Sequence, residues 1–188
     1  MVQYEELYND VKSILSEKRF RHSEGVVKRA IEYAKSYNLD IEKVKLVAIA
    51  HDIAKEIPEN EMISYAEKMG ITLDDIEKEN KALIHGKVGA KICEEKYGFT
   101  EEMTNAIKYH TTGRVGMNLL DKIIFLADKT EEGRSYEELD WLVKTAKTNI
   151  NEAMIFVLKF NINKSLETNT LLHPDAVYAY NEIIKYLK

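Results

Sequence analysis

The hydrophobic residues of this chain recur every three or four positions over most of its length. Leu7, Val11 and Ile14 keep this spacing in the first segment, and Val26 and Ala30 keep it in the second. Such a period is typical of an α-helix that buries one face. No stretch longer than four residues alternates apolar and polar positions as a half-buried strand would. The pattern therefore predicts an all-α chain.

Two segments are apolar on almost every side. The first is 44–54, which follows a candidate capping residue, Asp40, and the second is 119–129. A helix that is hydrophobic all round is usually buried among other helices. We expect these two segments to lie at the centre of the fold.

Proline and glycine indicate several other helix boundaries, because proline favours the first turn and glycine the end of a helix. The chain holds only 8 glycines and 2 prolines, which is little turn material for a sheet. Capping-box spacing joins Thr72 to Asp75 and Ser135 to Glu138. We expect one domain over residues 1–188, a bundle of roughly nine to eleven helices. Its other helices are predicted from Pro58 to a closing Gly70, from Ile84 to Tyr97 with Gly98 ending it, from a capping Thr100 to His110, over 136–147 and 150–167, and from Pro174 onward.

Charge and composition exclude several classes of function. The 188 residues include 27 Lys and Arg against 32 Asp and Glu, a net charge of −5, so a general nucleic-acid binder is not expected. No apolar run approaches the roughly 20 residues that span a bilayer, and the first residues do not resemble a signal peptide. The single cysteine, Cys93, excludes a cysteine-based zinc cluster and is expected to be an inert packing residue. We expect a cytoplasmic protein without membrane partners.

A histidine and an aspartate stand together at the end of the first all-apolar segment. A carboxylate buried there without a partner costs several kcal/mol, so Asp52 needs a cation. Lys55, one turn further on, is one candidate. A metal ion held by His51 and Asp52 together is the other, since imidazole and carboxylate suit Zn, Mn, Fe or Co.

Other histidines and a second aspartate favour the metal. Asp128 follows the apolar run 123–127 and poses the same problem of a carboxylate at a buried helix end. His22, His85 and His110 are three of the four remaining histidines of the chain and lie on other predicted helices. The two acids therefore need a shared cation, which a metal with imidazole ligands supplies.

The order His22, His51-Asp52, His85, His110, Asp128 resembles the HD superfamily of metal-dependent phosphohydrolases. Finer stretches resemble its YqeK family, whose members split diadenosine tetraphosphate symmetrically into two ADP. These stretches are 19–22, 51–55, 83–86, 110–114, 126–128 and 173–175, and the resemblance extends from Arg19 to about Asn181. One segment departs from it: after Asp128 the family usually has Tyr-Ile-Glu-Pro-x-Arg, and this chain has Lys129-Thr130-Glu131-Glu132-Gly133-Arg134.

The resemblance implies one HD phosphohydrolase domain with one or two transition-metal ions, iron first and Mn, Co, Zn or Ni as alternatives. It implies His22, His51, Asp52 and Asp128 as metal ligands, and His85 and His110 as ligands of a second metal or of the phosphate. Asp52, Lys55, His85 and His110 are the implied catalytic residues. The implied nucleotide- and phosphate-binding residues are Arg19, Asp52, Ile53, Ala54, Lys55, His85, His110, Thr111, Thr112, Asp128, Arg134, Thr170, Leu171, Leu172, His173, Pro174 and Asp175.

Three other functions stay open at this point. One is a different HD phosphohydrolase, acting on deoxynucleotides or cyclic dinucleotides. Another is an HD-type di-iron oxygenase, which would use the extra histidines to hold two irons. The third is a nucleotide-binding regulator without turnover. The expected partner is a small dinucleoside polyphosphate or nucleotide, and the sequence is also compatible with a homodimer. Trp141 is expected in the core.

Overall fold

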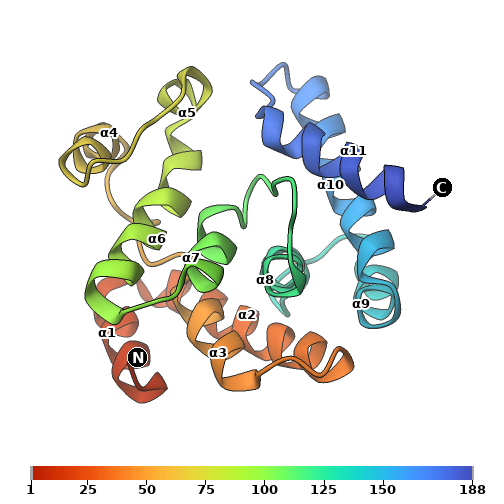
Figure 1. The fold of residues 1–188 in the computed structure, drawn as a ribbon, viewed down its shortest axis with the longest axis horizontal. Coiled ribbons are helices and arrows are strands. Elements are labelled where there is room, and N and C mark those ends of the chain that lie inside the picture. The colour runs from red at the N-terminus through yellow and green to blue at the C-terminus, as the bar shows by residue number, and fades with distance from the viewer. Residues whose placement is uncertain (1, 188) are drawn as a thin grey trace.

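The computed structural model describes residues 2–187, and helices are the only regular secondary structure within them (Figure 1). This confirms the all-α prediction, and the eleven α-helices of the described residues fall within the predicted number. They are α1 (Tyr4–Ile14), α2 (Glu17–Ser36), α3 (Ile41–Ala50), α4 (Glu59–Lys68), α5 (Asp75–Glu79), α6 (Ile84–Tyr97), α7 (Glu101–Lys108), α8 (Leu119–Thr130), α9 (Leu139–Thr148), α10 (Ile150–Glu167) and α11 (Pro174–Leu187), with a short 3-10 helix, η1 (Lys81–Leu83), before α6.

Helices α3 and α8 lie at the centre, as their apolar sequences predict. Helix α8, seen nearly end-on in the middle of Figure 1, contacts α2, α3, α7 and α10. From Leu120 to Asp128 only Lys122 is not buried, and α3 is buried continuously from Leu46 to Ala50. Because both helices are covered on every side, a polar residue at their ends is held inside the protein.

Two smaller groups of helices flank this centre. Helices α4, α5 and α6 form one lobe, and α10 and α11 pack together on the opposite side (Figure 1). The first lobe has its own hydrophobic cluster, separate from the main core, which is made of Ala54, Met62, Ala66, Leu73, Ile84 and Val88.

The helix caps confirm some predicted boundaries and correct others. Asp40 caps α3, since its side chain accepts a hydrogen bond from the backbone N–H of Glu42 at 3.0 Å. The capping box predicted at Thr72 and Asp75 is wrong: Asp74 and Glu77 form it. Leu73 is buried in the small cluster, so the chain enters the lobe there and the helix begins two residues later than predicted.

A second predicted capping box, between Ser135 and Glu138, is also wrong. Helix α9 begins only at Leu139, and no side chain caps it. The hydroxyl of Tyr136 donates to the backbone carbonyl of Lys129 at 3.0 Å. This contact holds the segment after α8 against that helix, so α9 begins later in the sequence than predicted.

Trp141 is not a core residue, contrary to the prediction. Its side chain is 44% exposed and packs at a tilt against Phe156, with ring centroids 5.1 Å apart. The buried face of α9 is formed by Leu142 and Ala146, one turn apart. Trp141 precedes this face by about 100° around the helix, so it lies at the edge of the buried stripe.

Cys93 is fully buried in the main core, as predicted, and its thiol should be unreactive in the folded protein. Burial raises the pKa of the Cys93 thiol far above its ordinary value, so almost no thiolate exists near neutral pH. We expect iodoacetamide at pH 8 to leave the native protein unmodified and to alkylate one thiol after denaturation, as measured by mass. Rapid alkylation of the native protein would contradict this burial.

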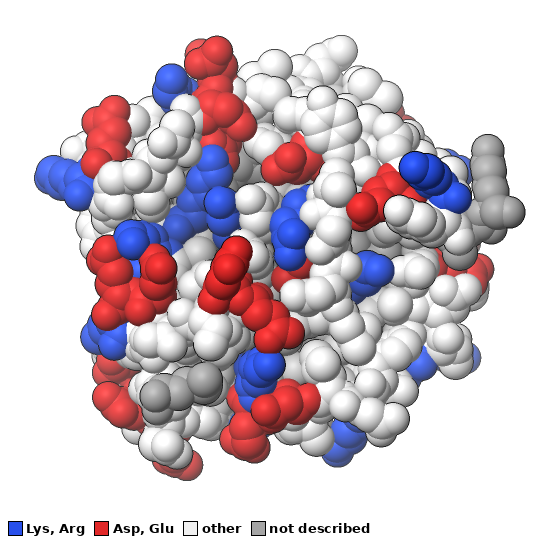
Figure 2. Space-filling model, viewed as in Figure 1, with Lys and Arg blue, Asp and Glu red and all other residues white. Residues whose placement is uncertain are grey.

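The charged surface is mixed. On the face shown in Figure 2, acidic and basic side chains of the described residues are interspersed, and neither kind of charge forms a continuous patch across it. Between residues 2 and 187, no helix has both the length and the hydropathy that crossing a bilayer requires.

Candidate metal centre

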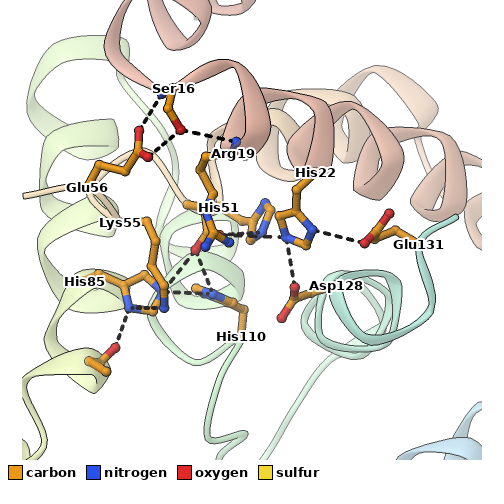
Figure 3. Close-up of polar contacts among 12 residues, drawn as sticks. Ser16, Arg19, His22, His51, Lys55, Glu56, His85, His110, Asp128 and Glu131 are labelled. Carbon is orange, nitrogen blue, oxygen red and sulfur yellow. Dashed lines mark hydrogen bonds and ion pairs between the residues drawn. The ribbon is translucent and has the colours of Figure 1, made fainter. Parts of the chain in front are cut away.

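Histidines and aspartates from five helices meet beside the buried end of α8. His22 lies in the second turn of α2, His51 follows α3, His85 lies in the first turn of α6, His110 follows α7, and Asp128 lies in the last turn of α8. In Figure 3 their side chains point toward one another. Asp52, next to His51, is 3% exposed, and all the residues of this group except His22 are buried. The residues predicted from the sequence as metal ligands therefore lie together.

A glycine allows two of the histidines to meet. A methyl group on Gly86 would lie 2.7 Å from the backbone carbonyl oxygen of Lys108, closer than real Cβ atoms approach. Helix α6 therefore packs directly on the end of α7. The Nε2 atoms of His85 and His110 consequently lie 3.1 Å apart although 25 residues separate them.

Three of the histidines are oriented by the same local contact. In each, Nδ1 lies within hydrogen-bond distance of the backbone carbonyl three residues earlier, which can only accept, so Nδ1 carries the proton. The opposite nitrogen, Nε2, then presents a lone pair to the centre of the cluster. The pairs are His51 with Ala48 at 2.8 Å, His85 with Ala82 at 2.6 Å and His110 with Ile107 at 2.7 Å.

Asp52 lies between these imidazoles. Its Oδ1 atom is 3.1 Å from Nε2 of His85 and 3.6 Å from Nε2 of His110. Its Oδ2 atom is 3.6 Å from Nε2 of His51 and accepts a hydrogen bond from Nη1 of Arg19 at 2.9 Å. Nε2 of His22 lies 3.8 Å from the same Oδ2, so one carboxylate faces four imidazole nitrogens and one guanidinium.

His22 is oriented differently, by a residue that sequence reasoning missed. Its Nδ1 atom lies 3.3 Å from Oε1 of the buried Glu131, and its Nε2 atom lies 3.1 Å from Oδ1 of Asp128. Glu131 reaches this position because Gly25 has no side chain: a Cβ there would lie 2.7 Å from the carboxylate. Carboxylates that hold a ligating histidine from its far side are common around metals. The sequence signal for Glu131 was that it keeps the glutamate of the family pattern in a segment whose neighbouring positions depart from it.

The protonation states suit a metal. Burial lowers the pKa of His51 to about 4 and that of His85 to about 4, so both rings are neutral near pH 7. Burial alone would raise the pKa of Asp52, but the imidazoles of His51, His110 and His85 hold that pKa well below its usual range. For Asp128, Lys129 and His22 likewise outweigh burial and hold the pKa low. The cluster therefore offers neutral imidazoles and ionised carboxylates, the ligand forms that metals bind.

Two buried atoms of the cluster lack a partner. Nε2 of His22 and Nε2 of His51 make no hydrogen bond within the described residues. One ligand atom each from His22, His51 and Asp128 lie within 4.8 Å of one another, and so do those of His51, Asp52 and His110. A transition-metal ion fits this donor set, because it takes the unused lone pairs and the carboxylate charge together. Lys55, the other partner considered for Asp52, approaches His85 instead, with Nζ 3.3 Å from Nδ1.

Four cationic side chains surround the cluster. Besides Arg19 and Lys55, Lys129 donates to Oδ2 of Asp128 at 2.8 Å, and Nη2 of Arg134 donates to Oδ1 of Asp128 at 3.0 Å. Arg134 thus lies beside the predicted metal ligand although the sequence before it departs from the family pattern. Lys129 was not predicted from the sequence. Together these cations can bind the several negative charges of a polyphosphate.

The predicted nucleoside-binding residues line a cleft next to the cluster. Its volume is about 380 Å³, and it includes Thr111, Thr112 and Lys129 on one side and Thr170, Leu171, Leu172 and His173 on the other. Pro174 and Asp175 line a smaller hollow of about 160 Å³ that shares Thr111, Thr112 and His173. Ile53 and Ala54 are buried in the two hydrophobic cores and line neither hollow. We call the larger cleft the threonine cleft.

The family model described as "HD domain" matches residues 19–133. The chain belongs to the HD-domain family. The match begins at Arg19, three residues before His22, and includes His51, Asp52 and Asp128. The HD assignment thus covers every predicted metal ligand, and it confirms the family predicted from the sequence.

Similar proteins within the HD-domain family cover nearly the whole chain. Two proteins named "Bis(5'-nucleosyl)-tetraphosphatase, symmetrical" are each 38% identical to it: that of Halalkalibacterium halodurans over 93% of this chain and 93% of its own, and that of Bacillus subtilis over 96% and 97%. A crystal structure from Clostridium acetobutylicum, described as a predicted HD superfamily hydrolase involved in NAD metabolism, aligns with a TM-score of 0.94. It is 34% identical and covers 99% of both chains.

Proposed function

We propose that this HD-domain protein is a metal-dependent hydrolase that cleaves diadenosine tetraphosphate symmetrically into two ADP. The observation that carries the proposal is the buried cluster itself. Its unpartnered imidazole nitrogens and ionised carboxylates suit a metal, and the four cations around it suit a polyphosphate. The two relatives named as symmetrical tetraphosphatases support the same substrate.

In this proposal His22, His51, Asp52 and Asp128 hold the metal, with iron preferred and Mn, Co, Zn or Ni as alternatives that the same ligands accept. A metal bound there supplies Lewis-acid polarisation of a phosphoryl oxygen and lowers the pKa of a water ligand. Glu131 keeps His22 in the tautomer whose Nε2 faces the metal. His85 and His110, whose Nε2 atoms converge on Asp52, hold either a second ion or the scissile phosphate.

The cations bind and orient the phosphate chain. Arg19 and Lys55 lie on the Asp52 side of the cluster, and Lys129 and Arg134 lie on the Asp128 side. A tetraphosphate that passes between them has positive charge on both sides of its central bridge. These groups are already in place before reaction, so they stabilise the charge that develops on the phosphoryl oxygens and on the leaving diphosphate.

One nucleoside occupies the threonine cleft in this proposal, with Thr111 and Thr112 toward the phosphates. Thr170, Leu171, Leu172, His173, Pro174 and Asp175 lie toward the nucleoside. Residues 1–188 act as a single catalytic domain, and we place this activity in the cytoplasm, where a single free thiol is usual.

The position of cleavage tests the function directly. Hydrolysis of diadenosine tetraphosphate in ¹⁸O-labelled water should yield ADP only, because water adds to one central phosphorus and the bond from it to the bridging oxygen breaks. One of the two ADP molecules then carries the label. Mass spectrometry of the products reads both results, with metal-chelated protein as the control. AMP and ATP as the main products would refute the symmetrical reaction.

A further inference from the structure

A second cleft opens on the other side of Lys129, between the segment that follows α8 and helix α10. Its volume is about 550 Å³, within the range of small-molecule sites. We call it the aromatic cleft. It is lined by Lys129, Gly133, Arg134, Ser135, Tyr136, Leu142, Phe156, Val157, Phe160, Asn161 and Lys164.

Aromatic side chains form a large part of this cleft. Tyr136, Phe156 and Phe160 line it together with the buried side chains of Leu142 and Val157. Phe160 is 53% exposed, although its helix neighbour Val157 is in the core. Exposed aromatic rings beside a phosphate-binding region are the platforms on which nucleic-acid bases stack.

The inner end of the cleft is cationic and reaches the metal centre. Lys129 and Arg134 line it, and both donate to the carboxylate of Asp128. Lys129, Asn161 and Lys164 line the threonine cleft as well. The two clefts therefore meet at Lys129, next to a predicted metal ligand, and extend away from it in two directions.

We propose that the aromatic cleft binds the second nucleoside of the dinucleoside tetraphosphate, with its base stacked on Phe160. This rests on the proposed function. In a dinucleoside tetraphosphate the two nucleosides lie the same number of bonds from the central bridging oxygen. A protein that cleaves at this bridge therefore needs one nucleoside site on each side of it. Two clefts that share Lys129 and Lys164 meet this requirement, with the shared lysines along the phosphate chain.

The remaining large hollow near the metal centre is chemically less suitable. It has a volume of about 820 Å³ beside α2, and its lining contains five glutamates against five lysines and arginines, with no phenylalanine, tyrosine or tryptophan. Those carboxylates are Glu17, Glu24, Glu56, Glu131 and Glu132. They offset the positive charge that would attract an anionic nucleotide, and without a Phe, Tyr or Trp ring the hollow offers its base no stacking platform.

The test compares Phe160→Ala with Phe160→Trp and with Leu166→Ala, which removes a 63% exposed side chain of the same helix that lines neither cleft. Stacking of one base on an aromatic ring corresponds to about a tenfold change in affinity. We expect Phe160→Ala to raise KM for diadenosine tetraphosphate about tenfold with little change in kcat. Phe160→Trp should restore the wild-type KM, and Leu166→Ala should not change it.

Binding of ADP alone separates this inference from a general loss of function. The affinity of the metal-loaded protein for the first ADP equivalent, which occupies the threonine cleft, should be the same in the wild type and in Phe160→Ala. An unchanged KM in Phe160→Ala, or an equal loss of ADP affinity, would overturn the second nucleoside site. If the wild type does not cleave the dinucleotide, the proposed function fails instead, and equilibrium binding of the intact dinucleotide to the same variants still decides the role of Phe160.

Discussion

Asp52→Ala should abolish hydrolysis and release most of the bound metal. Asp52 is buried and faces the Nε2 atoms of His51, His85 and His110, so its loss removes the carboxylate on which these imidazoles converge. Lewis-acid stabilisation by a metal is worth several kcal/mol, so its loss should lower kcat/KM by at least about a thousandfold. Metal content by elemental analysis and steady-state rates measure the two effects on one sample.

Asp121→Asn is the matched control for Asp52→Ala. Asp121 is a second buried carboxylate, 1% exposed, but it pairs with Arg114 at 2.6 Å and takes no part in the histidine cluster. We expect the Asp121 variant to keep its metal and most of its rate, even if its thermal stability falls. If Asp52→Ala retains full metal content and full rate, the proposed ligand set is wrong.

Lys55→Ala should weaken substrate binding and leave the metal in place. The ammonium group of Lys55 lies beside His85 at 3.3 Å, and its pKa is lowered because the side chain is largely buried. A charged hydrogen bond to a phosphate oxygen is worth about 1.5–3 kcal/mol, so kcat/KM should fall roughly ten- to a hundredfold. The loss should lie mainly in KM. Steady-state kinetics with a parallel measurement of bound metal check both parts.

The structure does not support the alternative that Lys55 is an ordinary surface lysine in an exposed ion pair. A surface lysine would pair with Glu56 or Glu59, but both carboxylate oxygens of Glu56 accept hydrogen bonds from Ser16 (Figure 3). Lys43→Ala provides the control, because Lys43 is also partly buried and pairs with Glu102 far from the cluster. A kcat/KM for Lys55→Ala that matches that of Lys43→Ala would remove Lys55 from the site.

The helices and their burial could be predicted because both depend on neighbours in the sequence. The apolar positions of α3 and α8 recur at the helical period. Asp40 begins α3 and Gly98 ends α6, both through contacts with the local backbone. The predictions that failed depend on tertiary contacts. Trp141 is exposed because α9 turns Leu142 and Ala146 toward the core.

The sequence by itself determined the fold class and indicated the side chains that we propose as metal ligands, because buried carboxylates and clustered histidines imply a cation wherever the chain folds. The tertiary structure alone decided which residues surround those ligands. Glu131 reaches His22 across 109 residues because Gly25 leaves room, and Lys129 lies where two clefts meet. Such contacts depend on how helices pack, which no local spacing encodes. The same packing leaves Phe160 half exposed beside the metal centre, and it is why the second nucleoside site could be inferred only from the structure.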